Sequence, residues 1–190
     1  MYCQLRLLVL LSCLLAGHFH TAAAELKEGL PAPAFRAELL DGAKFDSASL
    51  LGKVIVLNFW ATWCTPCREE MPAIDAFYRA HRGEGLEVIA LSIDDPRDIA
   101  KVRRVVKDFS FAVAMTPGTQ IAGYGRLSRV PVTFVIDRQG VLRLDGLKFA
   151  KLLNQTNLES LVAPLLRHST QDIATSTRPL EKRELLATGR

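Results

Sequence analysis

The sequence predicts an α/β fold built around a central mixed β-sheet. Two continuous apolar runs, at 54–59 and 86–93, have the β-branched content of strands buried on both faces. A segment with helical apolar spacing follows each run, and strands joined through helices pair in parallel. Two shorter runs, at 132–136 and 141–144, flank the turn sequence at 137–140 and predict an antiparallel hairpin. We therefore expect parallel and antiparallel sections in one sheet, with helices on both faces.

The other elements follow from turn residues and periodicity. Pro31 and Pro33 hold the entry extended, and Asp41-Gly42 between short apolar stretches predicts an N-terminal β-hairpin extension. We further expect a helix from Cys64 to near Gly83, a helix opened by Asp95-Pro96, a short strand at 111–115 and a last helix at 157–168.

The composition is globular, and the charge and the apolar pattern each exclude one class of protein. The chain has 190 residues, of which 49% are apolar and 23% charged. Its net charge of +4 is spread without a basic stripe, so no nucleic-acid partner is expected. The one unbroken apolar run near the start is about half of a bilayer span, which excludes a polytopic membrane protein.

Residues 1–24 have the features of a secretory signal peptide. Arg6 supplies a positive start, 7–16 form a short apolar core, and Ala22-Ala23-Ala24 offers small residues at a cleavage site. An uncleaved membrane anchor is an alternative. A lipoprotein signal ending at Cys13 is another, although apolar residues continue beyond it.

Removal of this leader leaves Cys64 and Cys67 as the chain's two cysteines. An exported protein with one such pair has no disulfide framework, so the pair is expected to act chemically. The folded domain is expected over 25–168, followed by a polar, flexible tail at 169–190.

Cys64 comes soon after the first buried strand, where the next helix begins. Helix N-terminal amides are unpaired and partly positive, so a thiolate there is stabilised and its pKa falls. The two intervening residues, Thr65 and Pro66, let one helical turn bring Cys67 within bonding reach. The spacing therefore predicts a redox pair, in which Cys64 attacks a disulfide and Cys67 resolves the mixed disulfide.

Two other roles for the pair are weaker. Zinc needs four ligands, and the only histidines beyond the leader, His81 and His168, lack ligand spacing. A purely structural disulfide would close too small a loop to add much stability. We expect no metal and no cofactor besides the redox-active pair itself.

Several segments resemble the thioredoxin superfamily, and within it the exported TlpA/ResA-like branch. They are FWATWCTPC at 59–67, the N-terminal segments 29–35 and 51–53, Pro72 five residues after Cys67, and 130–137. The resemblance runs from Leu26 to His168 and implies a thioredoxin-like fold.

The resemblance also implies roles for single residues. Pro131 would be cis and face the cysteine pair, and the backbone of Val130 would pair with a bound peptide as an added strand. A trans Pro131 at a strand start is the alternative. Trp63, Thr65 and Pro66 would form the contact surface for substrate, whereas Trp60 is expected to be scaffold.

One departure from cytoplasmic thioredoxins concerns proton transfer. Asn58 stands where they have a buried Asp, and an amide cannot take a proton from Cys67. Glu70 matches an acidic residue that ResA-like proteins place near the active site, which implies a role in proton handling. The alternative is a solvated helix residue beside Glu69.

The expected function is that of a periplasmic thiol–disulfide oxidoreductase. The Thr65-Pro66 dipeptide lacks the His of strong oxidants, which favours a reductant, and a reductant in an oxidising compartment needs an electron supply. The resemblance implies a membrane donor of the DsbD or CcdA type and exported clients such as apocytochrome c. The segment 125–130 lacks the signature of dedicated cytochrome-maturation thioredoxins, so the client stays open.

Three alternatives remain at this stage. A dithiol oxidase or isomerase would use the same cysteines at a higher potential. A copper metallochaperone is the less favoured alternative, because copper carriers on this fold use a wider cysteine spacing and a distant His, neither of which is found in this sequence. A peroxidase is disfavoured because no Thr or Ser stands three residues before either cysteine.

Overall fold

The computed structural model describes residues 26–125, 127–149 and 151–167. The predicted leader at 1–24 and tail at 169–190 lie outside this part of the chain. Within it, no helix is long and apolar enough to cross a bilayer.

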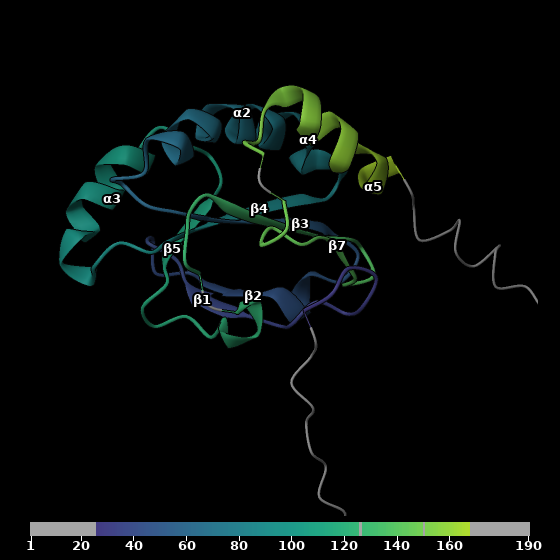
Figure 1. Ribbon diagram of the computed structural model, residues 1–190, viewed down its shortest axis with the longest axis horizontal. Helices are drawn as coiled ribbons and strands as arrows, with labels where there is room; N and C mark the ends of the chain where they lie inside the picture. The colour runs from purple at the N-terminus through teal and green to yellow at the C-terminus, as the bar shows by residue number, and fades with distance from the viewer. Residues whose placement is uncertain (1–25, 126, 150, 168–190) are drawn as a thin grey trace, which may run out of the picture.

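A five-stranded sheet forms the centre of the molecule (Figure 1). Its strands are β3 (Val54–Trp60), β4 (Leu86–Ser92), β5 (Ala112–Met115), β6 (Val132–Ile136) and β7 (Leu142–Leu144). The order is β5-β4-β3-β6-β7, with β3, β4 and β5 parallel and β6 antiparallel to both β3 and β7. The predicted mixed sheet is confirmed, and the two longest apolar runs form the central strand β3 and its neighbour β4.

The α-helices cover one face of this sheet (Figure 1). They are α2 (Thr65–His81), α3 (Ile99–Val106), α4 (Gln155–Leu161) and α5 (Ala163–Arg167). The steps from β3 to β4 and from β4 to β5 run in the same direction across the sheet. Right-handed crossovers therefore place α2 and α3 on the same face. The expected last helix is divided after Leu161, where Pro164 lacks the N–H that a continuous helix would need.

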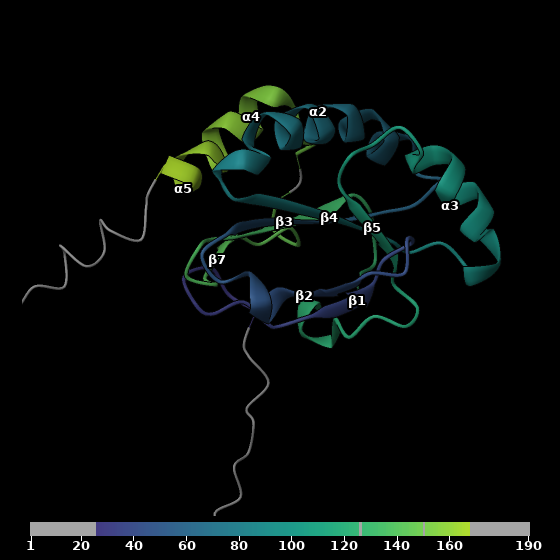
Figure 2. The same ribbon diagram turned by 180° about the vertical axis from the view of Figure 1, so that it is seen from behind.

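The second face is covered mainly by the N-terminal extension (Figure 2). Its hairpin consists of β1 (Arg36–Glu38) and β2 (Lys44–Asp46), which confirms the turn predicted at Asp41-Gly42. Short 3₁₀ turns at Ser47–Leu50 and Ala122–Tyr124 complete the layer. Helices were expected on both faces of the sheet. Here the second face carries these short 3₁₀ turns and no α-helix among the described residues.

The same extension also covers both edges of the sheet. At the β7 edge, Leu142 N–H donates to Leu30 O (2.9 Å), and at the β5 edge Leu40 N–H donates to Val113 O (2.8 Å). These bonds occupy backbone N–H and C=O groups of the edge strands, which could otherwise pair with a strand of another chain. The extension is thus integral to the domain.

Candidate active site

The two cysteines lie where β3 ends and α2 begins, and they form a disulfide with Cα atoms 5.3 Å apart. Cys64 is the N-cap of α2, and its Sγ accepts a hydrogen bond from the backbone N–H of Cys67 (3.2 Å). Cys64 is 6% exposed and Cys67 is fully buried. Cys64, at the helix N-terminus, is therefore the less buried of the two cysteines, which suits it better to attack a disulfide.

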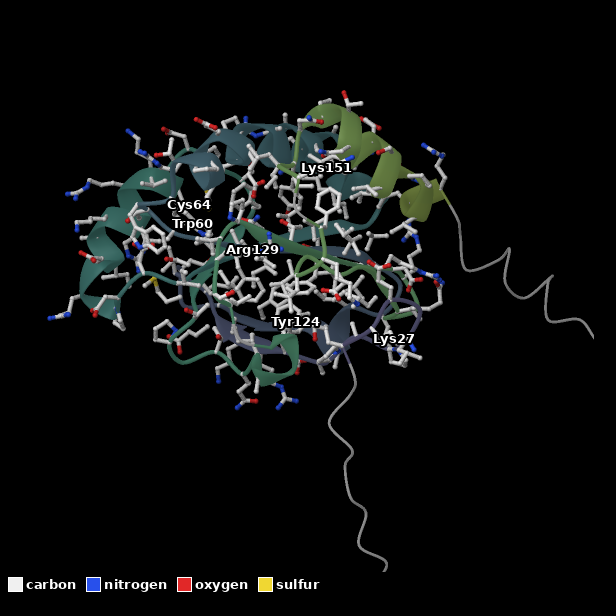
Figure 3. The ribbon with its side chains drawn as sticks, in the orientation of Figure 1. Lys27, Trp60, Cys64, Tyr124, Arg129 and Lys151 are labelled. Carbon is white, nitrogen blue, oxygen red and sulfur yellow. A yellow bond between two sulfur atoms is a disulfide. The ribbon has the colours of Figure 1, made fainter. Side chains whose placement is uncertain are left out.

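A tight turn connects β3 to the cysteines, in which Cys64 N–H donates to Ala61 O (3.1 Å). Trp63 within this turn is 66% exposed, and Thr65 and Pro66 beyond it are exposed as well. Trp60 is fully buried at the end of β3. Three of the predicted contact residues thus surround Cys64 at the surface, and Trp60 lies in the core as expected. Figure 3 shows Trp60 and Cys64 close to the start of α2.

The turn is held by Asp94, which the sequence analysis did not single out. Its buried carboxylate accepts from Thr62 N–H (2.9 Å) and from the Thr62 hydroxyl (2.6 Å). Asp94 follows β4, whose carboxyl end lies beside that of β3. An acidic residue after the second buried strand was the signal that could have found it, because ligands and catalytic groups gather at this edge of parallel sheets.

The Val130–Pro131 peptide bond is cis, as the resemblance implied. Both residues are half-buried and immediately precede β6, which pairs with β3 through Val132 opposite Phe59. This register brings the cis-proline segment to the cysteine end of β3. Next to it, the Arg129 guanidinium donates to Leu147 O (2.6 Å), which ties this segment to the chain beyond β7 (Figure 3).

Glu70 is buried one helical turn beyond Cys67, with only 3% of its surface exposed. One carboxylate oxygen accepts from the Asn58 amide (2.7 Å) and the other from Leu153 N–H (3.0 Å). Burial raises the pKa of Glu70, and these two hydrogen bonds offset part of that rise. The alternative of a solvated helix residue does not fit this position.

Asn58 links the helix to the sheet. Its amide group donates to Glu70 and also to Thr133 Oγ1 (2.9 Å), which lies opposite Asn58 in the β3–β6 register. Asn58 Oδ1 has no hydrogen-bond partner among the described residues. Thr133 and Leu153 are members of this network that sequence reasoning missed, since neither residue type signals a function by itself.

The described residues hold no group of three or more His, Cys, Asp and Glu side chains that could bind a metal ion. His81 lies at the other end of α2, where it pairs with Glu84 (2.9 Å). His168 lies outside the described residues.

The sequence pattern of the AhpC/TSA family matches residues 29–144. The thiol–disulfide oxidoreductase ResA of a Bacillus cereus strain is 39% identical over 124 residues, covering 64% of this chain and 70% of that protein. ResA of Bacillus subtilis (strain 168) is 28% identical over 162 residues, covering 82% and 86%. A solved structure described as the thiol:disulfide interchange protein DsbE of Chlorobium tepidum is 26% identical, with a TM-score of 0.63 over 75% of this chain and 99% of the other.

The chain belongs to the AhpC/TSA family. Its ResA relatives and its thioredoxin-like structure together make it a thiol–disulfide oxidoreductase, and the Cys64–Cys67 disulfide stands where such an enzyme needs its redox pair.

The Asn58–Glu70 contact in this AhpC/TSA-family enzyme predicts a pH-dependent loss of stability for Asn58→Asp. The new carboxylate would face Glu70 at about the present 2.7 Å, so the pair would hold a proton and its folded-state pKa would rise. The penalty is small below the ordinary carboxyl pKa. It grows as pH rises from the ordinary carboxyl pKa to the raised one and then levels off, at about 2 kcal/mol near neutrality.

Urea unfolding at acid and neutral pH measures this effect. Asn58→Leu removes the same donor without adding a charge, so its penalty should vary less with pH. Equal penalties for Asn58→Asp at both pH values would show that the two carboxyl groups do not share a proton.

Proposed function

We propose that this oxidoreductase reduces disulfides in exported proteins, with Cys64 as the nucleophile. The observation that carries the proposal is the asymmetry of the pair: Cys64 is the N-cap of α2 and the less buried cysteine, whereas Cys67 lies inside the helix and is fully buried. A strong oxidant owes its potential to a highly stabilised thiolate. Here Thr65 and Pro66 supply no cation to Cys64, so the helix amides remain its main source of stabilisation.

The first step is a thiol–disulfide exchange between Cys64 and the client. The Cys64 thiolate of the reduced enzyme attacks one sulfur of the client disulfide, and the other client sulfur leaves as a thiolate. Cys64 is then joined to the client in a mixed disulfide. Trp63 and the backbone of Val130 are the groups proposed to hold the client during this step.

In the second step the Cys67 thiol loses its proton and attacks Cys64 Sγ. The second client thiolate leaves, and the enzyme is left with the Cys64–Cys67 disulfide seen in the structure. Two electrons have passed from the enzyme to the client. We propose Glu70 as the group that accepts the Cys67 proton, because it is buried one turn away and its raised pKa brings it closer to that of a thiol.

The proposed location is the periplasm. It is supported by the signal-like sequence at 1–24. Because the periplasm is kept oxidising, the Cys64–Cys67 disulfide must be reduced again by a donor of DsbD or CcdA type. Apocytochrome c, whose cysteines must be reduced before haem is attached, is one proposed client among exported proteins.

The reduction potential of the Cys64–Cys67 pair tests the direction. Trp60 and Trp63 lie just before the pair in the chain, so their fluorescence in a thiol redox buffer reports its redox state. Cys64→Ser is the control without a pair. We expect about −250 mV or lower, near the value of thioredoxin. A value of about −120 mV would instead make the enzyme an oxidase. Clients can then be trapped on Cys67→Ser, which stops after the first step.

A further inference from the structure

Asp94 is a buried carboxylate that the steps above do not use. It is 2% exposed, and its oxygens accept from Thr62 N–H, from the Thr62 hydroxyl and from the Ser92 hydroxyl (2.6 Å). The Ser92 hydroxyl in turn accepts from Asp94 N–H (3.1 Å), which fixes the orientation of the carboxylate. The carboxylate thus joins the end of β4 to the turn before the cysteines.

Thr62 lies in the turn that leads to Cys64, so its hydrogen bonds to Asp94 affect the position of Cys64. The turn runs from Ala61 to Cys64 and is closed by the bond from Cys64 N–H to Ala61 O. Thr62 is its second residue, so anchoring both its N–H and its hydroxyl fixes the path of the next two residues. Those two residues are the exposed Trp63 and the N-cap Cys64.

We propose that Asp94 is a positioning residue for Cys64. By holding Thr62, it keeps the Cys64 sulfur on the N-terminus of α2, where the sulfur accepts the Cys67 N–H, and keeps Trp63 facing solvent. This inference deepens the proposed function, on which it rests. A small displacement of a nucleophile can cost a large factor in rate even when the displaced contact is remote from the reacting atoms.

The neighbouring residue offers a matched control. Asp95 carries the same charge one position later, but its exposed carboxylate contacts Arg97 and makes no bond to the turn. Loss of negative charge near Cys64 by itself favours the thiolate and would speed its reactions. A slower reaction in Asp94→Asn but not in Asp95→Asn therefore reports the lost anchor.

The test is the rate at which iodoacetamide alkylates Cys64 in the reduced protein. Cys67→Ser is the background, with Cys3 and Cys13 also replaced by Ser, so that one thiol is followed. Asp94→Asn and Thr62→Val should each slow alkylation by about tenfold. The double variant should be no slower than the slower single variant. Thr62→Ser, which keeps the hydroxyl, and Asp95→Asn should stay within about twofold of the background protein.

If Asp94 had a purely structural role, its variants would have lower melting temperatures but unchanged alkylation rates. That result would overturn the proposal. If Asp94→Asn does not fold, the comparison of the alkylation rates of Thr62→Val and Thr62→Ser tests the proposal by itself. Alkylation needs neither a client nor a particular redox direction. A reduction potential typical of an oxidase would therefore contradict the proposed function but leave the alkylation test valid. Unchanged alkylation rates would contradict the role of Asp94 but not the proposed reductase function.

Discussion

Replacing Glu70 by Gln slows the second step by about 100-fold or more, because the buried Cys67 thiol loses its proposed proton acceptor. The glutamine keeps the size of the side chain and the contact with Asn58. The measurement starts from the mixed disulfide of Cys64 with 5-thio-2-nitrobenzoate, whose release on attack by Cys67 is followed by absorbance.

The pH dependence of the same step gives a second readout. A general base acts in its deprotonated form, so the wild-type rate should rise with pH through the raised pKa of Glu70. Glu70→Gln should lack this rise. Glu69→Gln, at the exposed neighbouring position, should behave as wild type. An unchanged release rate in Glu70→Gln would remove Glu70 from the mechanism.

Replacing Gly146 by Ala destabilises the domain by about 3 kcal/mol, which corresponds to a melting temperature lower by roughly 10 °C. A Cβ at this position would lie 2.4 Å from Thr133 O and 2.6 Å from Thr133 N. Both are backbone atoms of β6, so the strand must move. Thr133 also accepts from Asn58, so the displacement reaches the network around Glu70.

Gly83→Ala is the matched control. A Cβ there meets nothing within 4 Å, and the backbone does not adopt a positive φ, so its melting temperature should stay close to that of wild type. Thermal unfolding followed by circular dichroism measures both variants. Equal melting temperatures would mean that β6 can yield at Thr133 without cost.

The sequence alone determined the central strands, the N-terminal hairpin and the position of the cysteine pair. These features depend on local information: the unbroken apolar runs, the Asp41-Gly42 turn, and two residues between cysteines at a helix start. The cis bond at Pro131 was expected through resemblance, because no local property of the chain distinguishes it from a trans bond at a strand start.

Only the tertiary structure decided which polar groups surround the pair. Glu70 meets Leu153 across 83 positions of sequence, Asn58 meets Thr133 across 75, and Thr62 meets Asp94 across 32. Such contacts depend on strand register and on how α2 lies over the sheet, which no local pattern specifies. The same holds for α2 and α3, whose placement on one face follows from the direction of two successive crossovers. Burial of Glu70 is likewise a property of the packed layers, and it is burial that raises its pKa.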